Sequence, residues 1–364
     1  MKAVVPQEQL LKSIQVVERG VSERSTLPIL SHMLVAGEPG QLVLSATDLD
    51  LGLTCRCPAA VEEAGAIAIP ARRFGDVMKE LPNEEVTLQT KKNNTITIQC
   101  GSSFIRMMGL PKEEFPQLPT ADGERKVAIP QTTLKEMIQL TTFAMSTEET
   151  RYTLNGTLMV LRGNQLTLVA TDGRRLAAIT RELAHTEPQE RRYILPAKTV
   201  HELSRLLRDE GEASLHLLAD HQLAFELDGI TLISRLIEGE FPNYEKVIPG
   251  EVPTKVVLDR QGFMAATRRA NLLTTPASPS IRLELAKDRL TIFKESPEIG
   301  EVREELPAKY RGHDLTINFN PHYLLDVLKA LPTDDVALEL ASNKLPGVFR
   351  LPEYVYIVLP MQTA

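Results

Sequence analysis

Apolar residues recur at helical spacing in six segments of the chain. The first segment of each third begins at Pro6, at Pro130 or near Asp259. Apolar positions three or four residues apart place these side chains on one face of an amphipathic helix. The three apolar faces comprise Leu10, Leu11, Ile14 and Val17; Leu134, Met137 and Ile138; and Phe263, Ala266, Thr267 and Ala270.

A second helix is predicted in each third by the same spacing. Leu81-Pro82 and Leu331-Pro332 close two of these three helices, because proline cannot continue a helix. Their apolar faces comprise Phe74, Val77, Met78 and Leu81; Val200, Leu203, Leu206 and Leu207; and Leu324, Leu325, Val327, Leu328 and Leu331.

Between and after the helices, apolar and polar residues alternate with the period of two that is typical of strands. Residues 42–47, 165–171 and 289–293 show this pattern after the first helix of each third. After the second helix, residues 86–89 and 95–99 predict a hairpin around Asn93-Asn94. Its predicted counterparts are residues 214–217 with 223–227, and 336–340 with 354–359. Each third therefore reads as about two helices and eight strands, an α+β domain with helices on one face of an antiparallel sheet.

The thirds also share sequence. Asp76-Val-Met-Lys-Glu-Leu-Pro82 returns 250 positions later as Asp326-Val-Leu-Lys-Ala-Leu-Pro332, and Phe115-Pro116 returns 126 positions later as Phe241-Pro242. Thr47-Asp48 returns as Thr171-Asp172. A period of about 120 residues is the size of a small domain, far longer than a solenoid repeat. Turn-rich stretches at 119–123 and 249–253 predict domains at 1–122, 123–249 and 250–364.

Edge strands of such sheets must be paired or covered. Three domains in a row can pair edge to edge, which leaves the two ends of the chain open. A second copy of the chain can close both ends and give a ring of six domains.

Composition and charge narrow the class of protein. The chain has 364 residues, of which 43% are hydrophobic and 24% charged, as in ordinary globular proteins. It has no run of about 18 apolar residues and no secretory signal at its start, so we expect no membrane span and a cytoplasmic location. Cys55, Cys57 and Cys100 lack a metal-binding pattern and are expected to be buried thiols. The net charge of −7 is unlike that of a generic nucleic-acid binder, although it permits a local basic surface.

Seven local strings, in order along the whole chain, resemble those of the bacterial DNA sliding clamps, the β subunit of DNA polymerase III. The strings are Ser25-Thr-Leu-Pro-Ile-Leu30, Ala46-Thr-Asp-Leu49, Ile69-Pro-Ala-Arg-Arg73, Arg151-Tyr-Thr-Leu-Asn-Gly156, Ala170-Thr-Asp-Gly-Arg-Arg-Leu176, Phe241-Pro-Asn-Tyr-Glu-Lys-Val247 and Val358-Leu-Pro-Met361. The resemblance implies a head-to-tail dimer of three-domain chains, closed around duplex DNA, with helices lining the hole. It implies a processivity factor that performs no bond chemistry.

The resemblance also implies DNA contacts and a dimer seam. The DNA-contact residues are expected to be Arg24, Arg72, Arg73, Tyr152 and Lys198, whereas Glu148 and Thr153 depart from the family pattern. The helices carry acidic residues beside these cations, so a solvated mixed face is the alternative reading for each cation. The seam is expected to bring Ile105 and Met107 against Leu272 and Leu273 of the second copy, near a loop with the unusual prolines Pro276 and Pro279.

Members of the family bind partner proteins through a short motif of the type Gln-x-Leu-x-Phe, which docks in an apolar pocket. By position, the pocket residues are Leu154, Thr171, Gly173, Arg174, Arg175, Leu176, Pro242, Lys246, Val247, Asn320, Tyr323, Val358, Leu359, Pro360 and Met361. Arg174 stands where a histidine is frequent and Lys246 where an arginine is, and lysine lacks the planar fork of arginine. The alternative is that the apolar members are ordinary core residues and that Asp172-Gly173 is a simple turn.

The partners implied are double-stranded DNA without sequence specificity, a second copy of the chain, the polymerase III alpha subunit and the delta subunit of the clamp loader. Other polymerases, ligase and mismatch-repair proteins are implied through the same motif. No cofactor or metal is expected. An enzyme is one rival, but the chain has no G-x-S-x-G, P-loop or H-E-x-x-H motif. A repeat-built scaffold without a DNA role is another, and a specialised second clamp beside a housekeeping one is a third.

Overall fold

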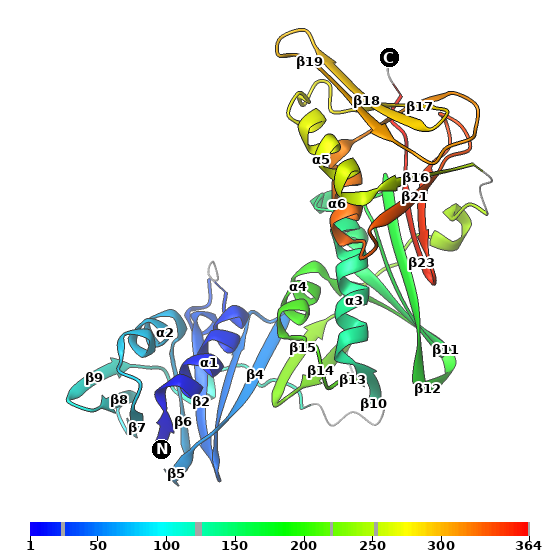
Figure 1. The fold of residues 1–364 in the computed structure, drawn as a ribbon. Helices are drawn as coiled ribbons and strands as arrows, with labels where there is room; N and C mark the ends of the chain where they lie inside the picture. Colours follow the sequence, from blue (N-terminus) through cyan, green and yellow to red (C-terminus); the bar gives the residue numbers. More distant parts are fainter. Residues whose placement is uncertain (23–25, 121–125, 219–220, 251–253, 363–364) are drawn as a thin grey trace. The chain divides into compact units, whose positions relative to one another are not determined.

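The computed structural model describes residues 1–22, 26–120, 126–218, 221–250 and 254–362 (Figure 1). The chain forms two compact units, one of residues 1–132 and 201–236 and the other of residues 133–200 and 237–364. The described residues contain six α-helices, which confirm the six predicted segments. They are α1 (Gln7–Val17), α2 (Ala71–Glu80), α3 (Gln131–Thr141), α4 (Ala197–Leu206), α5 (Arg260–Asn271) and α6 (Pro321–Ala330).

The first unit holds two antiparallel sheets. The five-stranded sheet has the order β5 (Ala60–Glu63), β1 (Lys2–Pro6), β7 (Glu85–Lys91), β8 (Thr95–Cys100) and β9 (Ser103–Met108). The eight-stranded sheet has the order β10 (Lys126–Pro130), β13 (Glu212–Leu217), β14 (Gln222–Leu227), β15 (Ile230–Arg235), β4 (Leu51–Pro58), β3 (Gln41–Thr47), β2 (His32–Glu38) and β6 (Gly65–Pro70). The hairpin predicted around Asn93-Asn94 is β7 with β8, and Asn94 has a φ of 54° in its turn.

The second unit also holds two antiparallel sheets. The six-stranded sheet has the order β11 (Gly156–Thr171), β12 (Arg175–Pro196), β23 (Tyr354–Val358), β22 (Gly347–Leu351), β21 (Asp335–Glu339) and β16 (Lys255–Asp259). The four-stranded sheet has the order β19 (Gly300–Pro307), β18 (Arg289–Ser296), β17 (Ile281–Ala286) and β20 (Leu315–Phe319).

Both joints between the repeats are made by strand pairing. At the first joint β4 pairs with β15, with Leu53 opposite Leu232. At the second joint β12 pairs with β23, with Leu176 opposite Ile357. These ladders confirm that neighbouring repeats pair edge to edge, and they satisfy the backbone groups that an open edge would leave unpaired.

Helices cover one face of each sheet and bury their apolar stripes there. Leu10 and Ile14 of α1 and Phe74 of α2 are fully buried in the first unit, and Phe263 of α5 and Leu324 of α6 are fully buried in the second. Figure 1 shows α1 beside α2 and α5 beside α6. The sheets position the loops at their ends, and these loops carry most of the candidate functional residues.

The three cysteines are free and buried, as the sequence predicts. Cys55 and Cys57 lie two residues apart on β4, and burial raises the pKa of both thiols. A buried thiol with a raised pKa is a poor nucleophile. These residues therefore act as core side chains.

The predicted hairpin of the third repeat is wrong in one respect. Residues 336–340 and 354–359 do not pair with each other, because β22 lies between β21 and β23. Strand β22 contains Gly347 and follows a loop that ends in Lys344, Leu345 and Pro346, so its sequence gives a short and weak alternation.

No helix among the described residues has the length and apolar character needed to cross a membrane.

Candidate functional site

The turn at residues 171–175 joins β11 to β12 and is held by its own side chains. The Thr171 hydroxyl accepts a hydrogen bond from the Gly173 N–H at 3.0 Å and donates one to the Arg175 carbonyl at 2.6 Å. The Asp172 carboxylate accepts from the N–H groups of Arg174 at 2.8 Å and Arg175 at 3.0 Å. These bonds use the polar atoms of Thr171 and Asp172 for structure, as is usual for an Asx turn. We call residues 171–175 the docking turn.

Gly173 of the docking turn has a backbone conformation that favours glycine, and its missing side chain leaves room for Arg151. Gly173 has a φ of +84°, and a Cβ added there would lie 2.7 Å from Nη1 of Arg151. Arg151 itself donates from Nη1 to the Asp172 carbonyl at 3.0 Å. Sequence reasoning did not single out Arg151, although it opens one of the strings that carry the family resemblance.

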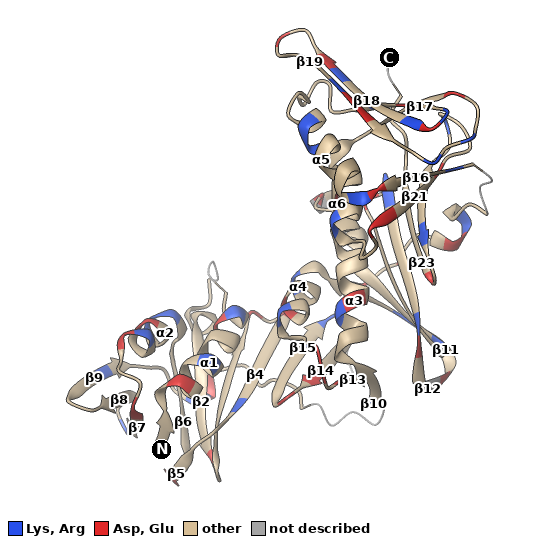
Figure 2. Cartoon of the chain, viewed as in Figure 1, with Lys and Arg blue, Asp and Glu red and all other residues tan. Residues whose placement is uncertain are grey.

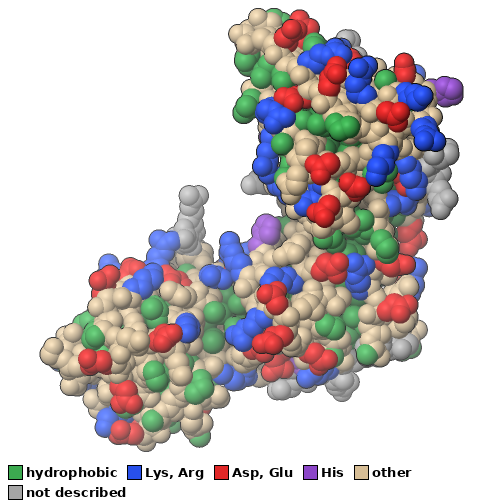
Figure 3. All heavy atoms as spheres, in the orientation of Figure 1, with side chains coloured by type: hydrophobic (Ala, Val, Ile, Leu, Met, Phe, Trp, Pro, Cys, Tyr) green, Lys and Arg blue, Asp and Glu red, His purple; other side chains and the backbone are tan. Residues whose placement is uncertain are grey.

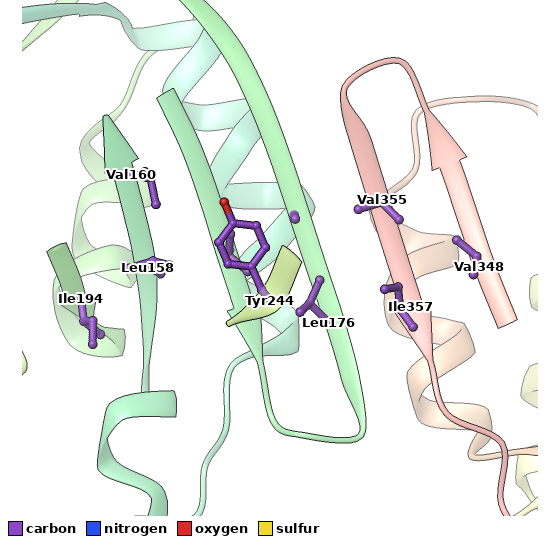
Figure 4. Packing of buried hydrophobic residues seen from close by; sticks show 10 residues of the cluster. Leu158, Val160, Leu176, Ile194, Tyr244, Val348, Val355 and Ile357 are labelled. Carbon is purple, nitrogen blue, oxygen red and sulfur yellow. The ribbon is translucent and has the colours of Figure 1, made fainter. Parts of the chain in front are cut away.

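An apolar cluster lies next to the docking turn. Leu176 packs with Tyr244 and with Val348, Val355 and Ile357 of the C-terminal strands (Figure 4). Phe241 and Ile248 pack against the same cluster, so the segment around Tyr244 covers this face of the six-stranded sheet. Leu176 is only 5% exposed and therefore forms the floor of this surface.

The C-terminal tail is fixed beside the docking turn by two backbone bonds. The Leu359 N–H donates to the Arg174 carbonyl at 2.9 Å, and the Met361 N–H donates to the Asn318 carbonyl at 2.8 Å. Leu359 remains 44% exposed after β23 ends. The structure thus brings the docking turn, the segment around Tyr244 and the tail together around Leu176, within the second compact unit.

The predicted pocket residues differ in exposure. The buried ones are Leu154, Thr171, Leu176 and Val358. Those that are partly buried are Arg175, Asn320, Tyr323, Pro360 and Met361, and the exposed ones are Gly173, Arg174, Pro242, Lys246, Val247 and Leu359. Asn320 also caps α6, since its side chain accepts from the His322 N–H at 2.9 Å.

Arg175 is held tightly beneath the turn. Its Nε donates to the Asp172 carboxylate at 3.0 Å and its Nη1 to Asp326 at 2.6 Å. Its guanidinium carbon lies 4.4 Å from the centre of the Tyr323 ring and 5.8 Å from that of Phe143. Burial alone would lower the pKa of Arg175, but Tyr356, Asp326 and Asp172 outweigh that effect and raise it. The side chain is 10% exposed and stays charged.

The predicted DNA-contact residues that the structure describes are exposed. Arg72 and Arg73 lie in the first turn of α2, beside a cavity of about 230 Å³ that Ser22 and Ser31 also line. Tyr152 is 60% exposed, and Lys198 is exposed in the first turn of α4. Arg24 lies outside the described residues.

Charges on the helices are mixed, as the sequence indicates (Figure 2). Lys12 pairs with Glu8 at 2.6 Å, Lys79 with Asp76 at 3.5 Å and Lys329 with Asp326 at 3.7 Å. The face drawn in Figure 3 likewise intersperses basic and acidic side chains. Such pairs moderate the attraction for a polyanion, because each cation has a competing partner.

The predicted seam residues lie on an outer strand and at a helix end. Ile105 and Met107 share one face of β9 and are partly buried, while Phe104 and Met108 on the other face are 60% and 67% exposed. Leu272, which follows α5, is 75% exposed, and Leu273 is partly buried. In the loop beyond them, which contains Pro276 and Pro279, the Ser278 carbonyl accepts a hydrogen bond from Lys294 at 2.8 Å.

Among the described residues, no group of three acidic, histidine or cysteine side chains is placed to hold a metal ion.

Comparison with known proteins covers the chain from end to end. Residues 1–119, 128–243 and 245–361 match the N-terminal, central and C-terminal domains of the DNA polymerase III beta subunit. The chain is 34% identical over 363 residues to the beta sliding clamp of Chlamydia pneumoniae, covering 100% of this chain and 99% of the relative. It is 35% identical over 370 residues to that of Pseudomonas putida, with both chains fully covered.

Solved structures agree with these relatives. The DNA polymerase III subunit beta of Pseudomonas aeruginosa superposes with a TM-score of 0.93 at 34% identity, and the sliding clamp of Bacillus subtilis with a TM-score of 0.95 at 29% identity; each comparison covers 100% of both chains. Since all three domains match in order and the matches span the whole chain, the chain belongs to the DNA polymerase III beta subunit family, the bacterial sliding clamps.

Proposed function

We propose that two copies of this chain close head to tail into a ring around duplex DNA and act as the processivity factor of a replicative polymerase. The match of the whole chain to sliding clamps carries this proposal. The protein is then a non-catalytic subunit of the polymerase III holoenzyme in the bacterial cytoplasm, at the replication fork.

The surface chemistry supports a sliding role. A ring that slides needs attraction to phosphates without reading of bases, because only base contacts carry sequence information. Exposed Arg72, Arg73 and Lys198 supply positive charge, and acidic neighbours on the same helices keep the attraction moderate. Arg24 and Tyr152 complete the proposed DNA-contact set, although position 24 lies outside the described residues.

Retention on closed DNA tests the ring. The protein is loaded onto nicked circular plasmid with a bacterial clamp loader, and the bound fraction is measured by gel filtration before and after the plasmid is linearised. We expect retention on the circle and loss on linear DNA, and we expect Arg73→Ala to reduce the loaded fraction, with the largest difference from the parent at low salt, where phosphate contacts contribute most. A dimer that remains on linear DNA, or a parent that never stays on the circle, would favour the scaffold reading over the clamp.

The docking turn, the segment around Tyr244 and the tail are the proposed site for client motifs. The exposed Val247 and Leu359 and the buried Leu176 offer apolar contact, while Arg174 and Lys246 offer polar contacts at the rim. Met361 adds an adaptable side chain. Clients through this site are proposed to be the polymerase III alpha subunit, the delta subunit of the clamp loader, other polymerases, ligase and mismatch-repair proteins.

A labelled Gln-Leu-Ser-Leu-Phe peptide tests this site by fluorescence anisotropy. We expect saturable binding by the parent and a loss of about tenfold or more for Val247→Asp, which places a charge on a 57% exposed apolar position. Leu49→Asp is the matched control, because Leu49 is 52% exposed in the corresponding turn of the first repeat. Equal losses for both variants would place the docking site elsewhere.

A further inference from the structure

The repeat of the chain provides an internal comparison for the docking turn. The turn at Thr47–Leu51 lies 124 positions earlier and is built in the same way. There the Thr47 hydroxyl accepts from the Leu49 N–H at 2.9 Å, and the Asp48 carboxylate accepts from the Leu51 N–H at 2.7 Å. Leu49 has a φ of 81°, close to the +84° of Gly173.

The two turns share their first two residues and differ at the last three, of which the fifth is the one that contacts α6 in the docking turn. Leu51, which is 1% exposed, stands where the docking turn has Arg175. Because the first turn forms without an arginine, the guanidinium of Arg175 is not required to make the turn. Its bonds to Asp172 and Asp326 must serve a purpose that the first repeat lacks.

The acidic residues at equivalent positions of α4 and α6 indicate what these bonds do. Glu202 on α4 and Asp326 on α6 are 124 positions apart, and each pairs with a cation three residues on, Arg205 or Lys329. Each acid also approaches an arginine of the preceding repeat. Glu202 lies 3.8 Å from Arg19, whereas Asp326 bonds to Arg175 at 2.6 Å.

The arginine therefore occupies a different element at each joint. Arg19 belongs to a 3-10 helix (Glu18–Gly20), and its counterpart 124 positions later is Phe143, whose ring lies beneath Arg175. At the second joint the arginine that bonds to the helix acid is Arg175 of the docking turn. The helix acid of the third repeat is thus tied to the turn only where that turn is the proposed client site.

We infer that Asp326 is a positioning residue for client binding: it holds the Arg175 guanidinium against Tyr323 and so fixes the docking turn to α6. The inference rests on the proposed docking function of this surface. It also means that Arg175, with its nitrogens bonded to two carboxylates, supports the site from beneath rather than contacting the client side chains. An arginine bonded to carboxylates in a partly buried site gives directional bonds that an exposed pair does not.

The same peptide titration tests the inference with Asp326→Asn, Asp326→Glu, Arg175→Lys and the double variant Arg175→Lys with Asp326→Asn. We expect Asp326→Asn and Arg175→Lys each to weaken binding about tenfold, with the double variant no weaker than either single one, because residues that share one interaction are not additive. Asp326→Glu keeps the carboxylate and is expected to recover part of the affinity. Dimer state and melting temperature are measured for every variant.

Glu202→Gln is the matched control, since it breaks the corresponding contact at the first joint, away from the docking turn. It is expected to bind the peptide as the parent does. Parent-like binding by Asp326→Asn, or an equal affinity loss in Glu202→Gln at equal loss of melting temperature, overturns the inference while leaving the docking site intact. A folded parent that fails to bind the peptide overturns the docking site itself, and this inference with it.

Discussion

At the residue scale, the candidate site combines side chains with two different duties. Leu176 and Val358 are almost wholly buried and hold the sheet face together, whereas Val247 and Leu359 are exposed and free to meet another molecule. The polar atoms of the docking turn are used within the turn. Recognition by the proposed site is therefore expected to depend on apolar contact and on rim cations more than on the polar groups of the turn.

Leu176→Ala is expected to weaken both the fold and the peptide complex. Removing a buried leucine side chain costs about 2–5 kcal/mol of unfolding free energy. Denaturant unfolding and peptide anisotropy measure the two effects on the same samples. Val247→Asp should lower affinity with little change in unfolding free energy, and an unchanged unfolding free energy for Leu176→Ala would show that this residue does not belong to the core cluster.

Sequence reasoning named the residues of the proposed site but not how they are arranged. The strings around Ala170–Leu176 and Phe241–Val247 named the elements that the structure brings together. Exposure, the support from Arg151 and the bond between Arg175 and Asp326 arise from residues far apart in the sequence. Local patterns carry no information about such pairs.

At the scale of elements, strand pairing across the repeats dominates the architecture. The ladders of β4 with β15 and of β12 with β23 make continuous sheets across both joints. For this reason the two compact units divide within the second repeat, while the boundaries at 122/123 and 249/250 remain a prediction from the sequence. Helix positions followed directly from apolar spacing, but β22 was missed because its alternation is short.

The attachment of β19 to α5 is expected to depend on pH. Two hydrogen bonds from Arg269 at 2.7 Å lower the pKa of Glu304 below its ordinary value of 4.5. A lowered carboxyl pKa stabilises the folded state above the unfolded pKa, and this contribution disappears as the pH falls through the folded value. Glu304→Gln should therefore melt slightly below the parent at neutral pH, with the difference closing as the pH falls through the lowered pKa of Glu304.

Thermal melts of the parent, Glu304→Gln and the neighbouring Glu305→Gln measure this dependence. Glu305 is 48% exposed, so its variant serves as the control with little effect at any pH. A difference between parent and Glu304→Gln that persists in acid would show that the side chain acts through packing.

At the scale of the whole molecule, outer strands of the terminal repeats have one edge without a partner strand among the described residues. β9 is the last strand of the five-stranded sheet and β19 is an outer strand of the four-stranded sheet. Exposed apolar residues accompany them, among them Phe104 on β9 and Leu272 after α5. Closure by a second copy would cover these edges, as expected for a head-to-tail contact that closes on itself.

Leu272→Ala is expected to raise the dimer dissociation constant about tenfold. Leu272 is 75% exposed in the single chain, so the contacts that the substitution removes are those with the second copy. Analytical ultracentrifugation over a dilution series measures the constant, and Leu345→Ala, at a 51% exposed leucine, is the control. An unchanged constant would refute the proposed seam, and a fall in melting temperature of the monomer would indicate a packing role instead.

The sequence by itself determined the threefold repeat, the six helices, some of the strands and the family, because each of these follows from local spacing and local strings. Tertiary structure alone decided which edges pair, which pocket residues are buried and which arginine at each joint faces the helix acid. Glu202 and Asp326 lie on equivalent helices, but their partners Arg19 and Arg175 lie on different elements of their repeats. The reason is physical: the partner of a charged or apolar side chain is set by how sheets and helices pack in space, and a local pattern does not specify which distant residue that partner will be.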